Sequence, residues 1–179
     1  MKLLALDLGR SLGWCLGDSG VIPASGSLLL RKRDDANALA VGALGRWLRD
    51  CVRQKGKPDM IIVEHWMSPK AQKAVAIIED SLRLNGAVHA IAGVYGIPVA
   101  EPYPATVRSQ VCGKPYAEGE SARTGRKMSN TKWLVIDAMV FRGYLPKGCE
   151  DDDRADASAL WCWGEANYAK VAPERFVLT

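Results

Sequence analysis

Short apolar runs separated by turn residues open the chain. Residues 3–6 and 13–16 are mainly apolar, and the turn residues at 17–20 separate them from further apolar positions at 21–22 and 27–30. Runs of this length joined by tight turns predict two or three antiparallel strands.

A helical spacing of apolar positions follows. Residues 35–54 are predicted to form a helix, with Asp34 or Asp35 near its N-terminal cap. One face of this helix would contain Leu39, Leu44, Trp47, Leu48 and Cys51. Residues 60–63 are then four consecutive apolar residues, most of them β-branched. Such a run predicts a strand buried on both faces, as in a parallel sheet.

The rest of the pattern alternates helices with one more strand. We expect a helix over about 70–95, a short strand at 97–100, an irregular and mobile stretch at about 112–130, and helices at about 130–142 and 152–170. Hairpin strands followed by helices that alternate with single strands predict one α/β domain with a mixed sheet over residues 1–179.

Composition narrows the class of protein. The 179 residues are 48% hydrophobic and 25% charged, as in a soluble globular enzyme, and Asp7 and Arg10 interrupt the apolar stretch that a secretory leader would need. Five scattered cysteines without a C-x-x-C pair argue against a disulfide framework or a structural zinc site. We therefore expect a cytoplasmic protein without membrane contact, and the net charge of +4 weakly indicates a polyanionic partner.

Four acidic positions are candidates for chemistry. Asp7 ends the first apolar run and Glu64 directly follows the buried strand, where an unpaired charge is costly. Strand ends are where sites assemble in open α/β sheets. Asp153 and Asp156 open the last predicted helix, and their i, i+3 spacing puts both carboxylates on one face. Asp152 with Asp156 is the alternative pair, and we prefer Asp153.

Each acid alone has an ordinary explanation, because turns and helix caps often contain Asp and acids complement the helix dipole. Together they would repel one another unless divalent cations neutralised them. Ligands that are all oxygen favour Mg²⁺, with Mn²⁺ as a substitute, over Zn²⁺. Two such ions can activate a water and stabilise the leaving oxygen of a phosphodiester. The combination therefore predicts metal-dependent phosphodiester cleavage.

The acidic positions belong to a longer series of motifs that spans nearly the whole chain. In order, the motifs are Leu4-Ala5-Leu6-Asp7-Leu8-Gly9 with Gly13-Trp14, Ile61-Ile62-Val63-Glu64, Pro104-Ala105-Thr106-Val107-Arg108, Cys112-Gly113-Lys114, Lys132-Trp133-Leu134-Val135 and Asp153-Arg154-Ala155-Asp156-Ala157. In the same order, these motifs resemble six elements of the RuvC-like resolvases. The elements are the D-x-G-x-x-x-G opening, the second acidic strand, the P-x-x-V-K element, a G position, a K-x-x-V position and the D-x-x-D-A helix. The compact phage members of that family are especially similar.

This resemblance implies a ribonuclease H-like fold, with a mixed five-stranded sheet flanked by helices. It also implies a homodimer that makes paired, metal-dependent cuts across four-way (Holliday) or other branched DNA, in a bacterial or phage-infected cell. By carry-over, the four acids would hold two Mg²⁺ ions. Lys132, as a catalytic residue, and Lys114 would lie near the scissile phosphate.

One position departs from the family pattern. The bacterial members usually have an aromatic residue three positions after the acidic strand's Glu, close to the junction centre. Here that position is Met67, and Trp66 comes one residue earlier. Trp66 either makes the corresponding DNA contact or belongs to the core.

Positive charge is concentrated between residues 108 and 132, where glycines are also frequent. The basic residues there are Arg108, Lys114, Arg123, Arg126, Lys127 and Lys132. A basic segment of this kind can follow a phosphate backbone, and Tyr116 can stack on an exposed base. The ordinary alternative is a solvated surface loop.

Other functions fit parts of the pattern. A ribonuclease H or YqgF-like nuclease acting on RNA or an RNA–DNA hybrid would use the same acids, and the basic segment favours DNA junctions only modestly. An actin-like ATPase also begins with D-x-G after a first strand, but the chain is too short for two lobes and lacks further Gly-rich phosphate loops. A catalytically inactive DNA-binding protein would not need all four acids.

Overall fold

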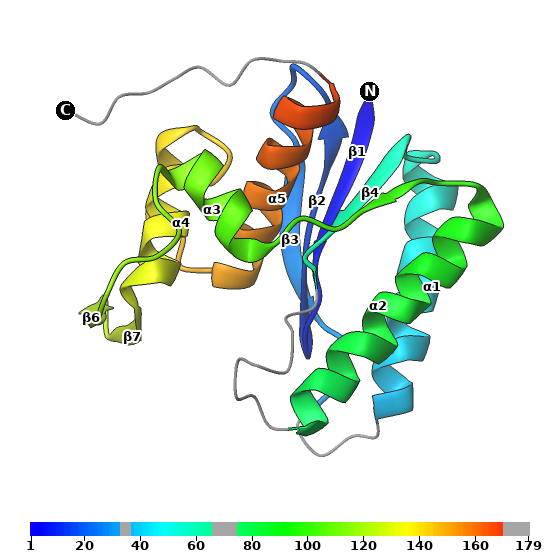
Figure 1. The fold of residues 1–179 in the computed structure, drawn as a ribbon, viewed down its shortest axis with the longest axis horizontal. Coiled ribbons are helices and arrows are strands. Elements are labelled where there is room, and N and C mark those ends of the chain that lie inside the picture. Colours follow the sequence, from blue (N-terminus) through cyan, green and yellow to red (C-terminus); the bar gives the residue numbers. More distant parts are fainter. Residues whose placement is uncertain (33–36, 66–74, 170–179) are drawn as a thin grey trace.

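A mixed five-stranded sheet forms the centre of the computed structural model, which describes residues 1–32, 37–65 and 75–169 (Figure 1). Its strands, in the order β3-β2-β1-β4-β5, are β1 (Lys2–Asp7), β2 (Ser11–Asp18), β3 (Ala24–Leu29), β4 (Met60–Val63) and β5 (Val99–Ala100). The first three strands are antiparallel, whereas β4 runs parallel to β1 and β5 runs parallel to β4. The predicted α/β class and mixed five-stranded sheet are confirmed.

Helices cover both faces of this sheet (Figure 1). On one side lie α1 (Asn37–Lys55) and α2 (Val75–Tyr95), and on the other lie α3 (Pro104–Cys112), α4 (Asn130–Phe141) and α5 (Asp152–Tyr168). Leu3 and Ala5 belong to the core on the α5 side, and Leu4 and Leu6 belong to the core on the α1–α2 side. Burial on both faces explains why the central strands read as continuous apolar runs.

The close approach of α5 to the sheet depends on a glycine. A Cβ atom at Gly164 would lie 1.8 Å from Cδ1 of Ile62 in β4. Near the middle of α5, the fully buried Trp161 donates a hydrogen bond from its ring Nε1 to the carbonyl of Leu3, over 3.2 Å. These contacts fix α5 against β1 and β4 along its length.

The predicted antiparallel strands are confirmed as β1, β2 and β3. Residues 21–22 lie in the connection, because pairing between β2 and β3 begins at Leu16 and Ala24. The stretch at 112–130 is not irregular throughout, because β6 (Glu120–Arg123) and β7 (Arg126–Ser129) form an antiparallel hairpin there. Its two turn residues, Thr124 and Gly125, have φ of 47° and 88°, as a tight hairpin turn requires.

The predicted helices agree with the structure more closely. Those expected over 35–54, 130–142 and 152–170 correspond to α1, α4 and α5, and the helix expected over 70–95 corresponds to α2, with its residues before 75 outside the described part. The short α3 was not predicted. None of the described helices combines the length and the apolar character needed to cross a membrane.

Candidate active site

The register of the central strands brings Asp7 and Glu64 side by side. Leu6 pairs with Val63 in the parallel ladder between β1 and β4, so that the next residues, Asp7 and Glu64, leave the same edge of the sheet. Both side chains are partly buried. The edge formed by the carboxyl ends of parallel strands is where sites assemble in such sheets.

The N-terminal part of α5 adds two more carboxylates, those of Asp153 and Asp156, to this edge. Asp7 pairs across the sheet with Gly13 of β2, and a Cβ atom at Gly13 would lie 1.9 Å from the carbonyl oxygen of Asp153. The bare glycine therefore lets α5 begin directly on β2, beside Asp7. Asp7, Glu64, Asp153 and Asp156 together are called the acidic cluster below.

The N-terminus of α5 is held in place by its own cap. The side chain of Asp151 accepts a hydrogen bond from the backbone N–H of Arg154, over 3.0 Å. Asp151 also accepts one from the Ser27 hydroxyl of β3, over 2.6 Å. An N-cap of this kind satisfies an otherwise unpaired helix N–H and fixes where the helix begins. The position of Asp153 and Asp156 thus follows from contacts outside the acidic cluster.

Burial and mutual repulsion disfavour the charged form of the acidic cluster. Burial raises the pKa of Asp7 well above its ordinary value, and the charges of Asp156, Glu64 and Asp153 raise it further. Burial, followed by the charge of Glu64, raises the pKa of Asp156 to about 7. Burial also raises the pKa of Asp153, although a hydrogen bond with the Ser11 hydroxyl opposes that rise. A bound cation would relieve this repulsion.

The donor chemistry of the acidic cluster fits a hard divalent cation. All four side chains offer carboxylate oxygens, which are the ligands that Mg²⁺ and Mn²⁺ prefer. Within the described residues, no group of three or more Asp, Glu, His or Cys side chains is already arranged to hold an ion. The backbone thus brings the acids to one place, while their carboxylates do not yet form a closed coordination shell.

The carboxylate of Asp152, the neighbour of Asp153, forms ion pairs with two basic side chains of the protein. Its buried carboxylate pairs with Lys132 of α4 and with Arg126 of β7. Burial alone would raise the pKa of Asp152, but the hydrogen bond and charge of Lys132 and the charge of Arg126 hold it below its ordinary value. Asp152 is therefore paired with basic residues, whereas the charge of Asp153 acts on Asp7, and the choice of Asp153 as the metal ligand stays a prediction.

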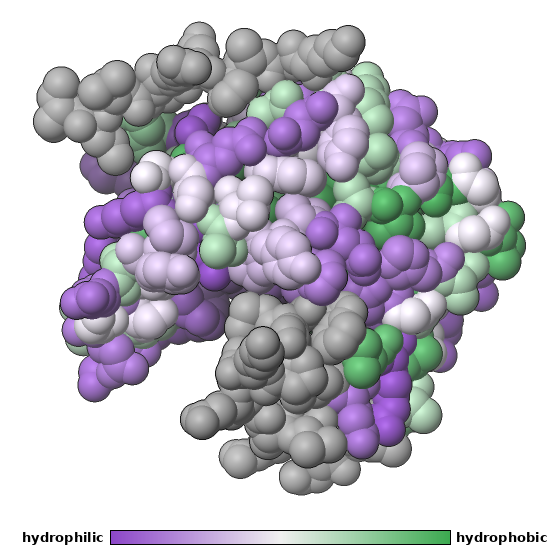
Figure 2. Space-filling model, in the orientation of Figure 1, coloured by the Kyte–Doolittle hydropathy of each residue, from purple (hydrophilic) through white to green (hydrophobic). Residues whose placement is uncertain are grey.

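One further basic residue, Arg108, lies near this site, and Lys114 is on the loop that follows α3. Arg108 of α3 donates a hydrogen bond from Nε to the carbonyl of Pro115, over 2.9 Å, and its charge lowers the pKa of Asp156. Lys114 lies exposed in the loop between α3 and β6, as does Tyr116. Figure 2 shows hydrophilic residues gathered over the side of the molecule that carries α4 and the hairpin.

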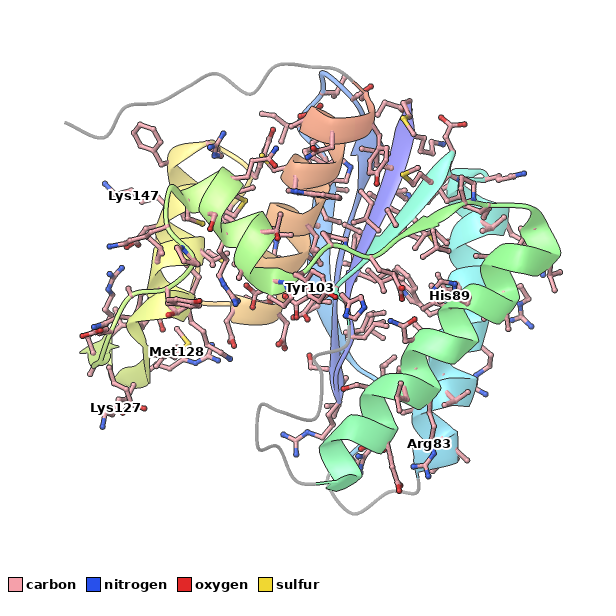
Figure 3. All side chains as sticks on the ribbon, viewed as in Figure 1. Arg83, His89, Tyr103, Lys127, Met128 and Lys147 are labelled. Atoms are coloured by element: carbon pink, nitrogen blue, oxygen red, sulfur yellow. The ribbon has the colours of Figure 1, made fainter. Side chains whose placement is uncertain are left out.

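The hairpin residues predicted to bind DNA have partners within the protein. Arg123 forms a two-pronged ion pair with Asp137, with N···O distances of 2.6 and 3.0 Å, and stacks 4.6 Å above the ring centroid of Trp133. Lys127, labelled in Figure 3, pairs with Glu120 of the opposite strand over 2.8 Å. These contacts hold the hairpin together and fix it to α4. Trp66 and Met67 lie outside the described residues.

Sequence reasoning missed a second polar group at the same sheet edge. Glu101 directly follows β5, and its carboxylate lies 3.0 Å from Nε2 of His89 on α2. The ring of His65 stacks on the exposed Tyr103, with centroids 4.4 Å apart (Figure 3). The sequence feature that could have identified Glu101 is an acidic residue immediately after a strand, the same feature that identified Glu64.

Comparison with known proteins gives structural neighbours only. No family model and no curated protein sequence matches the chain. A Thermus thermophilus RuvC structure matches with a TM-score of 0.62 at 19% identity, over 89% of this chain and 90% of that one. T. thermophilus RuvC in complex with Holliday junction substrate matches with a TM-score of 0.66 at 17% identity, over 96% of both chains.

The yeast mitochondrial Holliday junction resolvase Ydc2 also matches, with a TM-score of 0.57 at 13% identity, over 94% of this chain and 81% of that one. At these identities the likeness concerns the fold, and it extends along most of each chain. Together with the strand order and the placement of α5, it shows that the chain has the ribonuclease H-like fold of the RuvC-type resolvases.

Proposed function

We propose that the protein is a metal-dependent endonuclease that cuts four-way or other branched DNA. The observation that carries this proposal is the convergence of Asp7, Glu64, Asp153 and Asp156, from two strand ends and one helix, at a single edge of the sheet. Bringing four carboxylates together in a partly buried site destabilises a protein unless they bind cations. A purely structural role would not account for that cost.

Divalent cations would supply the chemistry that carboxylates alone lack. Asp7, Glu64, Asp153 and Asp156 would hold two Mg²⁺ ions, which would supply the activation of a water and the stabilisation of the leaving oxygen of a phosphodiester. The chain's own contribution is to hold the four ligands on rigid elements and to place a cation, Lys132, beside them. That ammonium group is suited to a non-bridging oxygen of the scissile phosphate.

Nucleic acid as the substrate is supported by the basic surroundings of the acidic cluster. Arg108 lies within electrostatic reach of Asp156, and Lys114 is exposed on the adjoining loop. Basic residues beside a metal site neutralise phosphates and increase the affinity for a polyanion. Branched DNA is the preferred class because the structural neighbours include a RuvC bound to a Holliday junction and a second Holliday junction resolvase.

A homodimer would allow two such sites to cut opposite strands of one junction. The face of α2 that turns away from the sheet supports this assignment, because it exposes Leu82 and Val94, with 42% and 84% of their surfaces accessible. Figure 2 shows hydrophobic residues interspersed with hydrophilic ones over this helix. Exposed apolar positions on a long helix suit a second copy of the chain.

A substrate panel tests the proposal. Four-way junctions, splayed duplexes, RNA–DNA hybrids and linear duplexes would be incubated with the protein in Mg²⁺ or in EDTA. We expect paired nicks in branched DNA only, and only with the metal. Cleavage confined to the hybrid would instead favour a ribonuclease H-like activity, and cleavage in EDTA would exclude the metal-dependent mechanism.

A further inference from the structure

We propose that Asp152 is a positioning residue, which holds Lys132 beside the acidic cluster and ties the β6–β7 hairpin to the first turn of α5. This inference rests on the proposed nuclease function and assigns to Asp152 a role different from that of its neighbour Asp153.

The surroundings of the Asp152 carboxylate support this assignment. Each oxygen binds a different cation: Oδ1 accepts a hydrogen bond from Nη2 of Arg126 at 2.5 Å, and Oδ2 accepts one from Nζ of Lys132. The carboxylate side chain is only 8% exposed, whereas the two basic side chains are 46% and 47% exposed. The anion is therefore the fixed, buried member of this group, and the cations lie on the surface around it.

The two cations come from different elements, so that Asp152 connects three parts of the structure. Lys132 lies in the first turn of α4, and its backbone N–H donates to the Ser129 cap. Arg126 begins β7 and also donates to the carbonyl of Glu150, just before α5. Through Asp152, the start of α5 is bound to both α4 and the hairpin.

This connection matters for the site because Asp152 and Asp153 are consecutive. Asp153 is hydrogen-bonded to Ser11 of β2, and Asp152 is bound to Lys132 of α4, so that the two consecutive acids are held by different elements. The charge of Lys132 in turn acts on Asp7, Asp153 and Asp156. The ammonium group therefore lies close enough to influence the metal ligands, and Asp152 is what keeps it there.

An acid that only complemented the helix dipole would behave differently. A first-turn carboxylate serves that purpose while exposed and without partners, and its contribution to stability is small. Asp152 is buried and binds two cations, an arrangement in which loss of one partner leaves the other charge uncompensated. Without Asp152, Lys132 would be free to turn into solvent.

The test is a double-mutant cycle between Asp152→Asn and Lys132→Ala. We expect Asp152→Asn to lower the single-turnover rate on a four-way junction roughly 10–100-fold, as misplacement of a reacting group does. Junction affinity in EDTA should change less than about threefold, and the Mg²⁺ concentration for half-maximal rate less than about twofold. In the Lys132→Ala background, Asp152→Asn should slow cleavage by no more than about twofold, because the two residues act as one unit.

A control and an activity-independent measurement accompany the cycle. Asp137→Asn removes a different carboxylate, which binds the hairpin cation Arg123 and not Lys132, so it should leave the single-turnover rate within about threefold of the unmodified protein. The unfolding temperatures of the Asp152 and Lys132 variants should also be non-additive, since the double variant loses the same ion pair only once.

Each alternative gives a distinct result. A rise of about tenfold or more in the Mg²⁺ requirement of Asp152→Asn would make Asp152 a metal ligand and overturn the inference. Independent effects of the two substitutions on rate and on unfolding temperature would overturn it as well. If the unmodified protein cuts none of the nucleic acids in the panel, the proposed function fails and this role fails with it, whereas an active protein with independent effects contradicts only the role of Asp152.

Discussion

The carbonyl oxygen of Asp153 lies where a side chain at Gly13 would begin, with only 1.9 Å between that oxygen and an added Cβ atom. Gly13 also pairs with Asp7 across β1 and β2. One glycine therefore sets the distance between the strand that carries the first acid and the helix that carries the last two. The close contact of two backbones, rather than any contact between the acids themselves, assembles this side of the acidic cluster.

Gly13→Ala should consequently displace the start of α5. The methyl group cannot be accommodated by rotation of a side chain, because it meets backbone, so we expect the free energy of unfolding to fall by about 1–3 kcal/mol or more. Cleavage should fall by at least about 100-fold, since Asp153 and Asp156 move away from Asp7. Chemical denaturation and single-turnover assays measure the two effects.

Gly42→Ala is the matched control for this substitution. Gly42 lies in α1, and an added Cβ there meets only the end of the flexible Arg46 side chain, at 3.4 Å. Ala is the better helix former, so this variant should be as stable as the parent or up to about 1 kcal/mol more stable, with unchanged activity. Equal behaviour of the two variants would contradict the role assigned to Gly13.

Asp156→Asn should stabilise the metal-free protein at high pH. The pKa of Asp156 is raised from 3.8 to about 7 in the folded protein, so ionisation of this group disfavours folding. The loss of stability builds up between about pH 4 and pH 7 and is complete above pH 7. Replacement by a neutral amide removes that loss, which we expect to be roughly 1–3 kcal/mol, allowing for partial exposure.

Thermal unfolding in EDTA from pH 4 to pH 8 measures this difference. The gain from Asp156→Asn should be largest at pH 8 and should vanish near pH 4. Millimolar Mg²⁺ at pH 8 should then stabilise the unmodified protein more than the variant, because ions that bind only the folded state raise its stability. A variant that is less stable at pH 8 would show that Asp156 contributes to folding as a charged group.

Lys114→Ala should weaken junction binding mainly through salt-dependent contacts. Lys114 is exposed on the loop between α3 and β6, so it is available to a phosphate. We expect the slope of log affinity against log salt concentration to fall by about 1. Lys57→Ala, an exposed lysine that precedes β4 at the opposite edge of the sheet, should leave that slope unchanged. Equal slopes for both variants would mean that Lys114 binds no phosphate.

The sequence predicted the central strands and the acidic residues because their signals are local. Residues 60–63 form an apolar run that only a doubly buried strand explains, and Glu64 interrupts it at the position where a charge would be costly. The positions of the acids in the sequence assign them to the ends of two strands and to one helix. The distances between these acids depend on the packing of α5 against Gly13, and in the sequence Gly13 is only one glycine within a strand.

The elements that were missed are stabilised by distant partners. The helix α3 has nine residues, and its cap residue Tyr103 makes no side-chain hydrogen bond, so that Pro104 at its start indicates a loop equally well. The β6–β7 hairpin has almost no apolar alternation, and it is fixed to α4 by the pairing of Arg123 with Asp137. The roles of Asp152 and Arg123 follow from such pairings, which the order of residues does not reveal.

The central claim is that the acidic cluster binds the metal ions that drive cleavage, and Asp7→Asn tests it most directly. Cleavage of a four-way junction in Mg²⁺ and binding of the same junction in EDTA would be measured for the unmodified protein and the variant. We predict that the variant is folded and binds the junction with an affinity within about threefold of the parent, but makes no detectable cut. Metal-dependent cleavage at a rate near that of the unmodified protein would contradict the account.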